Sequence, residues 1–550
     1  MCKIKIFSLG GLNDIGKNMF VVEIDDDIFV LDAGLKYADD SMLGIDYIIP
    51  NYDYLKENKK RIKGIFITHA HDEQMGALAD ILVDLDSIKV YGTKFTINII
   101  KEQLEEWNVK TDNLVTIKPH KKINFGSVSI FPVSVTHNVP ESVGYAIYTK
   151  DGIIFYTGNF VFDPTMQEPY KTDIGKLAYI GKQNVLCLMS ESIYATKKGY
   201  TSPSNRSNEV LKEALTRSEN RIIYTVSESH FYRIQELFDE VEKVSRNIIV
   251  LGKRLQNIVS SSIEQGYLRI KKGKIVDISH INDNNVIIMI SDEREKPFSN
   301  LKRIIKGYDK FVHINEKDTV IFANPIYDGM ERTVTKIYDD LAKIGTNIVP
   351  LSSNVKSYHA SSEDLMLIIN LMQPKYYFPV IGDYRSQVEN ADCAKQAGIK
   401  EENIILKTNG QVITFINGKL EDTGEKIPVD DILIDGKTVG DIGEVVIKDR
   451  ESLASNGIVI VTVTIDKLTK KILAGPEILT RGFIYVKDNL DIIKEASSIS
   501  LEVVKENIKE NYVDYNKIKQ GIRDRLGKYF YEQTECNPMI LIITQEINQD

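Results

Sequence analysis

Residues 65–78 of this chain read IFITHAHDEQMGAL, and more of the architecture follows from this stretch than from any other. It starts as a buried apolar strand and ends as the start of a helix, so a loop lies between the two. In that loop, His69 and His71 form an H-x-H pair. A loop that leaves an apolar strand can aim both imidazoles at one point, which is what a zinc ion needs. The stretch therefore predicts a metal site at the end of a strand.

Length and composition define the class of protein. The chain has 550 residues, too many for one core, so about three domains are expected. No run of about 18 apolar residues occurs and no signal-peptide pattern is present, so we expect a cytoplasmic protein without a membrane segment. The 4 cysteines form no C-x-x-C pair, which fits reduced thiols. A net charge of −9 argues against a generally basic nucleic-acid binder but allows a local basic groove.

The order of the patterns predicts several α/β segments. Residues 1–204 alternate short apolar runs with helical patterns, and 205–354 alternate strands and helices as a parallel sheet does. Residues 355–430 add a further amphipathic helix and a strand. Glycines punctuate residues 431–449, which we interpret as a linker. Residues 450–550 combine β-branched strands with two long helical patterns, which predicts a separate C-terminal domain.

A set of motifs spread over nearly the whole chain resembles one known family, the ribonuclease J family of β-CASP metallo-β-lactamase nucleases. The motifs are LGGLNDIGKNM at 9–19, LDAG at 31–34, THNVPES at 136–142, DILIDG at 431–436, VGDIG at 439–443, LAGPEI at 473–478 and RGF at 481–483. The resemblance implies a metallo-β-lactamase αββα sandwich made of residues 1–204 and 355–430. A β-CASP domain would be inserted at 205–354, and a small α+β domain would follow at 450–550.

The active family holds two divalent metal ions, which clamp a phosphodiester and activate water. The resemblance assigns one ion to His69, His71 and His137, all of which are present. The ligands of the second ion, namely two aspartates and two histidines, are replaced here by Glu73, Gln74, Asn159 and Ile381. Because charge and geometry are lost together, we predict that the second site is gone and that at most one zinc or manganese ion binds. The alternative is a metal-free cluster in which the three histidines are held by hydrogen bonds.

The resemblance also points to residues of the RNA site. His359 takes the place of a histidine that assists at the scissile phosphate, so His359 and Glu73 are the candidate catalytic residues. Ser357 and His359 are the candidate RNA contacts, although His359 could instead be a core histidine. Val355 replaces a histidine of the phosphate pocket. In residues 291–297, acidic and bulky side chains replace glycines that let a backbone approach phosphate, which argues against tight binding of a 5′ end.

Two kinds of function follow. The family cleaves RNA as endonucleases and 5′-to-3′ exonucleases in mRNA decay and rRNA processing, and this chain could be such an enzyme. Its altered motif favours instead a weakly active subunit that partners an active paralogue, as a homodimer or a hetero-oligomer. The helical patterns 490–509 and 515–532 would offer apolar faces for association, unless those faces pack within their own domain. Hydrolysis of β-lactams or small esters is disfavoured by the insertion and the C-terminal domain.

Overall fold

The computed structural model describes residues 2–38, 42–292, 298–324, 330–352, 355, 358–421, 423–436, 438–439, 444–484, 489–509 and 512–548. The chain forms two compact units, one of residues 1–37 with 46–433 and the other of residues 38–45 with 434–550. Among the helices of these described residues, none has both the length and the apolar character needed to cross a membrane.

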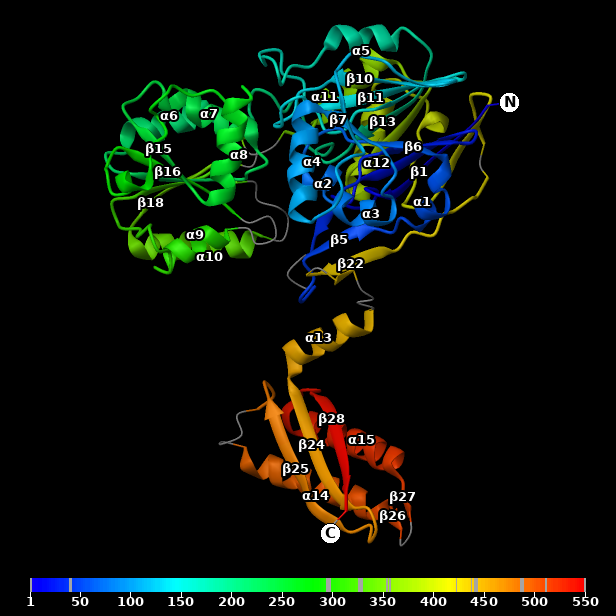
Figure 1. Cartoon of the computed structure of the whole chain (residues 1–550), viewed down its shortest axis with the longest axis vertical. Helices are drawn as coiled ribbons and strands as arrows, with labels where there is room; N and C mark the ends of the chain where they lie inside the picture. The colour runs from blue at the N-terminus through cyan, green and yellow to red at the C-terminus, as the bar shows by residue number, and fades with distance from the viewer. Residues whose placement is uncertain are drawn as a thin grey trace. The chain divides into compact units, whose positions relative to one another are not determined.

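Two sheets form the core of the first unit (Figure 1). The first contains, in spatial order, β21 (Lys419–Glu421), β20 (Ile413–Ile416), β1 (Lys3–Gly10), β2 (Met19–Ile24), β3 (Asp27–Leu31), β6 (Ile62–Phe66), β7 (Val90–Thr93) and β8 (Leu114–Ile117). The second contains β19 (Tyr376–Val380), β13 (Val185–Glu191), β12 (Gly152–Tyr156), β11 (Val143–Thr149), β10 (Val128–Ser134) and β9 (Ile123–Phe125). Buried rings meet between the sheets: Phe66 of the first lies 5.8 Å from Tyr145 of the second.

Helices cover the outer face of each sheet. Helix α4 (Lys94–Glu106) packs on β7 and β8 of the first sheet. On the second sheet, α11 (Ser362–Met372) contacts β13 and α12 (Tyr384–Gln396) contacts β19. Helix α5 (Ile174–Gly181) packs beside α11. The order helix, sheet, sheet, helix confirms the αββα sandwich that the sequence predicted.

Both sheets need strands from the end of the first unit. Strand β20 pairs with β1, with Ile416 opposite Lys3. Strand β19 runs parallel to β13, with Val380 opposite Glu191. Helix α11 leads into β19 and begins with a capping box in which Ser361 and Asp364 satisfy each other's backbone amides. The returning chain thus completes the two sheets that the N-terminal residues begin.

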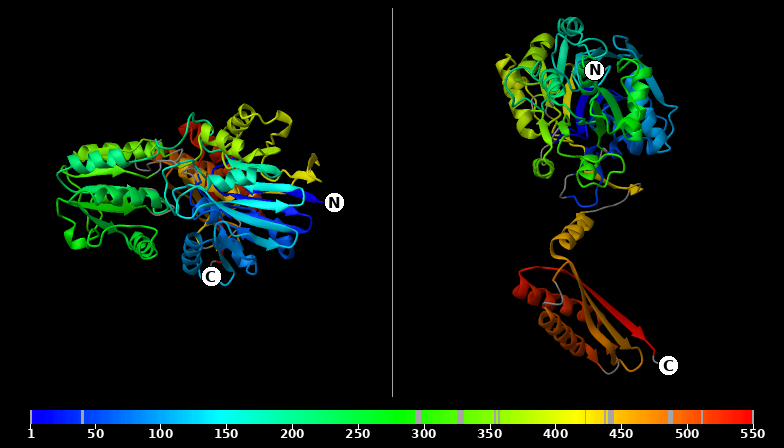
Figure 2. Two further views of the ribbon diagram at one scale, coloured as in Figure 1. Left: turned by 90° about the horizontal axis from the view of Figure 1, so that it is seen from above. Right: turned by 90° about the vertical axis from the view of Figure 1, so that its left-hand side faces the viewer.

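The segment between the two parts of the sandwich forms a parallel sheet with helices on both faces (Figures 1 and 2). Its strands, in spatial order, are β15 (Asn247–Leu251), β16 (Val286–Ser291), β14 (Ile222–Val226), β17 (Thr319–Phe322) and β18 (Asn347–Pro350). Its helices are α6 (Asn208–Arg217), α7 (Phe231–Val241), α8 (Lys253–Glu264), α9 (Ser299–Ile305) and α10 (Glu331–Ile344). In a parallel sheet, all carboxyl ends lie along one edge, where side chains for a site can gather.

The second unit has its own sheet and core. Strands β25 (Ile472–Arg481), β24 (Ile458–Asp466) and β28 (Met539–Ile547) carry α14 (Leu490–Glu506) and α15 (Tyr515–Thr534) on one side, as the right-hand view of Figure 2 shows. The inward faces of both helices are buried in one apolar cluster with β24, through residues such as Val503 and Leu526. The apolar faces that the sequence suggested for a partner therefore pack within their own domain.

The remaining elements are mostly short, apart from α13. They are β4 (Lys36–Tyr37), β5 (Tyr47–Pro50), α1 (Asp53–Glu57), α2 (Asp72–Met75), α3 (Leu78–Asp84), β22 (Asp431–Asp435), β23 (Thr438–Val439), α13 (Glu444–Asn456), β26 (Ile508–Lys509) and β27 (Tyr512–Val513), with 3-10 turns at Lys59–Arg61, Ile278–His280 and Glu401–Asn403.

Candidate metal centre

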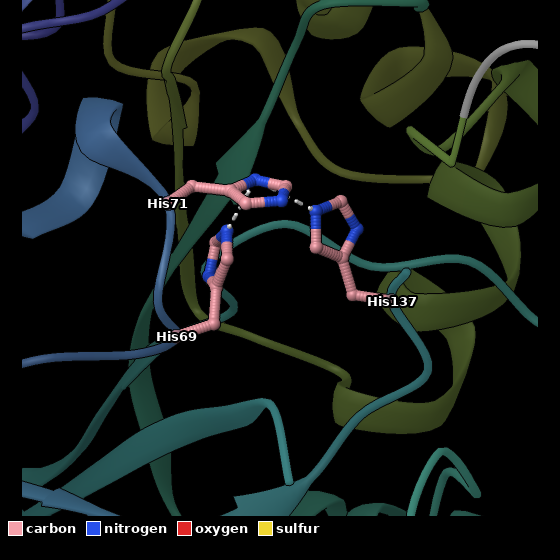
Figure 3. Close-up of side chains that lie close together, drawn as sticks. All are labelled: His69, His71 and His137. Carbon is pink, nitrogen blue, oxygen red and sulfur yellow. Dashed lines mark hydrogen bonds between the residues drawn. The ribbon is translucent and has the colours of Figure 1, made fainter. Parts of the chain in front are cut away.

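Three buried imidazoles meet at the ends of β6 and β10 (Figure 3). His69 and His71 lie in the loop between β6 and α2, and His137 lies in the loop after β10. The Nε2 atom of His69 is 3.2 Å from Nδ1 of His71. The Nε2 atom of His137 is 3.4 Å from the same Nδ1. The structure therefore brings together all three histidines that the sequence singled out for a metal.

The outer nitrogen of each ring has a partner that fixes the tautomer. Nε2 of His71 lies 3.3 Å from the carbonyl oxygen of Ser229, and Nδ1 of His137 lies 3.0 Å from that of Tyr358. A carbonyl can only accept a hydrogen bond, so the ring proton sits on each of these outer nitrogens. Nδ1 of His69 lies 3.0 Å from the Thr68 hydroxyl, which also contacts the buried Asp32 carboxylate. The inner nitrogens are left as three lone pairs that face one another.

Burial keeps these imidazoles neutral. It lowers the pKa of His71 to about 4, and the nearby His359 acts in the same direction. Burial also lowers the pKa of His69 and His137 well below the usual value, and the neighbouring imidazoles add to the effect. Neutral imidazole is the form that binds metals, so the cluster is a ligand set near pH 7.

The spacing of the inner nitrogens fits a single metal ion. Zinc bound by imidazole at about 2.0–2.1 Å with tetrahedral angles separates its nitrogen ligands by about 3.3 Å. The two separations that involve Nδ1 of His71, 3.2 and 3.4 Å, agree with this value, and all three ligand atoms lie within 4.8 Å of one another. Three lone pairs this close repel unless a cation lies between them. The residues present therefore fit one ion held by three histidines, with further positions open to water or substrate.

The four positions that the resemblance associates with a second ion carry Glu73, Gln74, Asn159 and Ile381. Gln74 is fully buried, and neither atom of its amide has a hydrogen-bond partner in the described part of the chain. The amide oxygen of Asn159 also lacks one there. Both amides are neutral and bring no charge to a cation. Ile381 is fully buried in the apolar cluster between the sheets, with a φ of 51°. Glu73 lies half-buried in α2.

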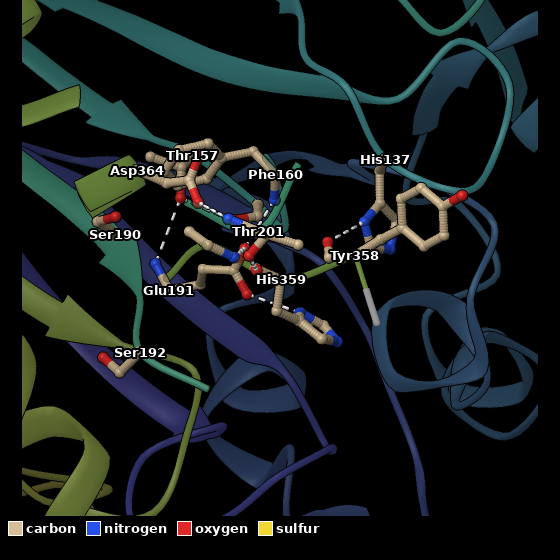
Figure 4. A network of polar contacts seen from close by, with 12 residues as sticks. His137, Thr157, Phe160, Ser190, Glu191, Ser192, Thr201, Tyr358, His359 and Asp364 are labelled. Atoms are coloured by element: carbon tan, nitrogen blue, oxygen red, sulfur yellow. Dashed lines mark hydrogen bonds and ion pairs between the residues drawn. The ribbon is translucent and has the colours of Figure 1, made fainter. Parts of the chain in front are cut away.

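A second constellation lies beside the histidine cluster (Figure 4). Glu191, at the end of β13, is fully buried, and its Oε2 lies 2.7 Å from Nδ1 of His359. Its other oxygen accepts hydrogen bonds from the backbone amides of Phe160 and Ala360. The ring of His359 lies 5.6 Å from that of His137, and its side chain remains 24% exposed. His359 is thus oriented by a carboxylate next to the candidate metal position.

Two residues near the site were not identified from the sequence. Glu191 has one sequence signal, since it is the charged last residue of a buried and mostly apolar strand. His230 is the residue before α7, on the carboxyl side of β14, and its ring lies 6.0 Å from that of His71. Burial, His71 and Arg233 lower its pKa well below the usual value. The sequence around His230 contains no motif that indicates a site. Its position near the cluster depends on the fold of the inserted domain.

The predicted phosphate pocket is described only in part. Ser357 and residues 293–297 lie outside the described residues. At the start of that loop, burial raises the pKa of Asp292 to about 6, and the Asn324 amide donates a 2.9 Å hydrogen bond to it. Val355 is buried, and its carbonyl oxygen accepts from Arg233. A carboxylate at this edge disfavours a bound phosphate.

Comparisons with known proteins cover the whole chain. The Beta-lactamase superfamily domain matches residues 31–174, the Ribonuclease J beta-CASP domain residues 219–341 and the Ribonuclease J C-terminal domain residues 445–547. Ribonuclease J 2 of Staphylococcus aureus is 37% identical over 99% of this chain and 98% of its own length. Ribonuclease J 2 of Staphylococcus epidermidis is 36% identical with the same coverage. A crystal structure of an Enterococcus faecalis protein of unknown function matches 75% of this chain and all of its own, with a TM-score of 0.53 and 15% identity, which concerns the fold alone.

Proposed function

Because the chain belongs to the ribonuclease J family, we propose that it acts in cytoplasmic RNA decay and maturation with weak intrinsic activity, mainly as the partner of an active paralogue. The observation that carries this proposal is the contrast within one site. Three neutral imidazoles converge at a spacing that fits one metal ion. Where a second ion would need ligands stand an isoleucine and two buried amides, whose oxygens have no hydrogen-bond partner among the residues that the structure describes.

The roles proposed for individual residues follow from their placement. His69, His71 and His137 would hold one zinc or manganese ion, which would polarise a phosphoryl oxygen or a bound water. His359, oriented by Glu191, would face the phosphate as a proton donor or acceptor. Glu73 and Ser357 remain candidates for catalysis and RNA contact. Without a second cation, less of the charge that develops on a phosphodiester is stabilised, so cleavage is slow.

A second candidate function is independent catalysis. The intact pairing of His359 with Glu191 and the ordered histidine cluster favour it, because a site without catalytic use has no need of either. In this case the chain would cleave RNA with one metal ion and one acid–base histidine. Both candidates share the substrate class, and they differ in the rate of the isolated protein.

Restoring the second site separates the two candidates. The variant Glu73→Asp, Gln74→His, Asn159→Asp, Ile381→His should cleave a 5′-labelled RNA at least about ten times faster than the natural chain, since a two-metal site works as a unit. Each single reversion should change the rate little. His71→Ala placed in the quadruple variant serves as the control and should abolish the gain.

Cleavage by the natural chain tests the second candidate function. Robust cleavage by the purified natural protein, lost in its own His71→Ala variant, would establish independent catalysis and refute the proposal of a mainly supporting role. The comparison uses the full chain, with manganese or zinc added to every sample at the same concentration.

A further inference from the structure

An exposed pair of aromatic side chains marks a surface of the inserted domain. The segment 306–311, which we term the aromatic loop, lies between α9 and β17 and reads KGYDKF. The side chain of Tyr308 is 76% exposed and that of Phe311 is 46% exposed. No other aromatic side chain in the described part of the chain is as exposed as Tyr308.

Hydrogen bonds and an ion pair hold the aromatic loop in a defined conformation. Helix α9 closes through Gly307, whose φ of 71° places it in the left-handed region, and the Tyr308 amide donates to the carbonyl of Arg303 at 2.9 Å. The buried Asp309 carboxylate accepts from the backbone amides of Phe311 and Val312, both at 2.9 Å. Its other oxygen pairs with Arg303 at 2.9 Å. Asp309 therefore points inward and holds the two rings outward at little further entropic cost.

The aromatic loop carries more positive than negative charge although the whole chain is negative. Lys306 and Lys310 are exposed, and neither forms an ion pair with any residue that the structure describes. The ammonium of Lys310 lies 5.4 Å from the centre of the Phe311 ring. The only carboxylate of the aromatic loop, Asp309, is already taken by Arg303. The surface thus offers two ring faces beside two available cations.

We propose that the aromatic loop is a second binding site for single-stranded RNA, an inference that rests on the proposed action of the chain on RNA. Bases of any sequence stack on exposed aromatic rings, and lysines beside the rings attract the phosphates. A protein partner would use Tyr308 and Phe311 equally well, but lysine is depleted at the centre of protein interfaces. The pairing of exposed rings with free lysines therefore favours nucleic acid.

This site lies at the opposite end of the inserted sheet from the histidine cluster. Arg221, which precedes β14, bonds the His313 carbonyl and pairs with Asp318 at 2.7 Å, so the chain after the aromatic loop is anchored at the amino end of the sheet. Ser229, which holds His71, follows the carboxyl end of β14. Strand β14 alone separates these ends by about 13 Å. The loop would hold a part of the RNA that does not lie at the histidine cluster.

RNA length and two double variants test this inference. The natural chain should bind an oligouridylate of about 20 nucleotides more tightly than one of about 4, because one such site covers roughly 4–16 nucleotides. Tyr308→Ala with Phe311→Ala should weaken the longer probe on the order of 10-fold and leave the shorter one unchanged. Tyr179→Ala, at a tyrosine that is 65% exposed on α5, is the matched control and should bind both probes normally.

The lysines have a separate readout. Lys306→Gln with Lys310→Gln should make the salt dependence of binding shallower, by about 1.4 in the slope of log K against log salt for two phosphate contacts on a single strand. Irradiation of a bromouridine-containing probe should attach RNA to the peptide that carries Tyr308.

The outcomes distinguish this inference from the proposed function. If the natural chain binds RNA and the Tyr308/Phe311 variant binds the long probe equally well, the second site is refuted and the action on RNA stands. If the natural chain binds no RNA at all, both are refuted. If that variant instead loses a protein contact while RNA binding is unchanged, the surface serves a protein and the inference fails.

Discussion

At the scale of single residues, two backbone carbonyls determine what the histidine cluster can bind. Ser229 belongs to the inserted domain, and Tyr358 lies just after it, yet each holds the outer nitrogen of a histidine from the sandwich. Because each carbonyl accepts the proton of the outer nitrogen, the inner nitrogen of the same ring directs its lone pair toward the centre of the cluster. In a cluster with no ligand, hydrogen bonds between the rings would stabilise the buried histidines more than three lone pairs that face one another.

This geometry predicts the metal content. The full chain should retain about one zinc ion per molecule after dialysis, since the residues that the structure describes contain one complete set of three ligands. His71→Ala should lose that ion, as elemental analysis would show, because the remaining pair has one ligand fewer and no fixed geometry. His280→Ala, at an exposed histidine outside the cluster, should keep it. Two firmly held ions in the natural chain would contradict the assignment of the second site.

A buried carboxylate away from the cluster predicts a dependence of stability on pH. Burial raises the pKa of Asp80 in α3 to about 6, although the Tyr47 hydroxyl donates to it at 3.2 Å. An unfolded aspartate has a pKa of about 3.9, so the folded protein holds a proton that the unfolded chain releases as the pH rises from about 4 to 6. The stability contributed by Asp80 is therefore present below pH 4 and lost above pH 6.

Asp80→Asn removes this ionisation. At pH 7 the variant should be more stable than the natural chain by about 1–3 kcal/mol, and the difference should vanish at pH 4. Urea denaturation of the full chain in chelator, at both pH values, measures it. Asp112→Asn, at an exposed aspartate, is the control and should behave alike at both. A larger gain at pH 4 than at pH 7 would reverse the sign and refute this account.

Sequence reasoning located only part of the site. The H-x-H pair and His137 could be found because their family motifs are local. Glu191 and His230 could not be connected to them, since each reaches the cluster through strand order, which no local pattern contains. The tautomers were also inaccessible, because the carbonyls of Ser229 and Tyr358 carry no residue-specific signal.

At the scale of elements, the patterns with one consistent period were predicted well. The alternating strands and helices expected in 205–354 are present as a parallel sheet with its helices, and the helix and strand expected within 355–430 are α11 and β19. Continuous apolar runs with clear ends leave few alternatives. The glycine pattern of 431–449 predicts a linker, and the structure has β22, β23 and the first half of α13 in this stretch. Glycines usually indicate turns, and these elements have few buried side chains, so their sequences show no clear apolar period.

The outer face of the C-terminal sheet follows from the packing of its helices. Because α14 and α15 cover one side, side chains of β25 and β28 on the other side stay exposed, including Leu479, Leu541 and Ile543. Leu479 and Leu541 both lie opposite Ile460 of β24, so they form one row across the sheet. The sheet of this domain thus exposes apolar side chains, whereas the apolar helix faces suggested by the sequence are buried.

At the scale of the whole molecule, the C-terminal domain is the part proposed to contact a partner. A chain truncated at about residue 445 keeps the first unit's sheets and its histidine cluster. It should no longer co-purify with an active paralogue that has an intact H-x-H-x-D-H motif, whereas the full chain should. Retained metal content is the control for folding. Co-purification of the truncated chain at full yield would show that the main contact lies elsewhere.

The pairing of β1 with β20 also has a consequence for synthesis. The partner of Lys3 is Ile416, so the ribosome adds roughly 400 residues, taking about 20–80 seconds, before the first strand gains its second neighbour. During that time the outer edge of β1 is bare, and a bare edge invites pairing with another chain. The lysines at positions 3 and 5 place charge on this edge and discourage such encounters. The inserted domain, whose strands all pair among themselves, can fold first and return the chain to an edge that has stayed free.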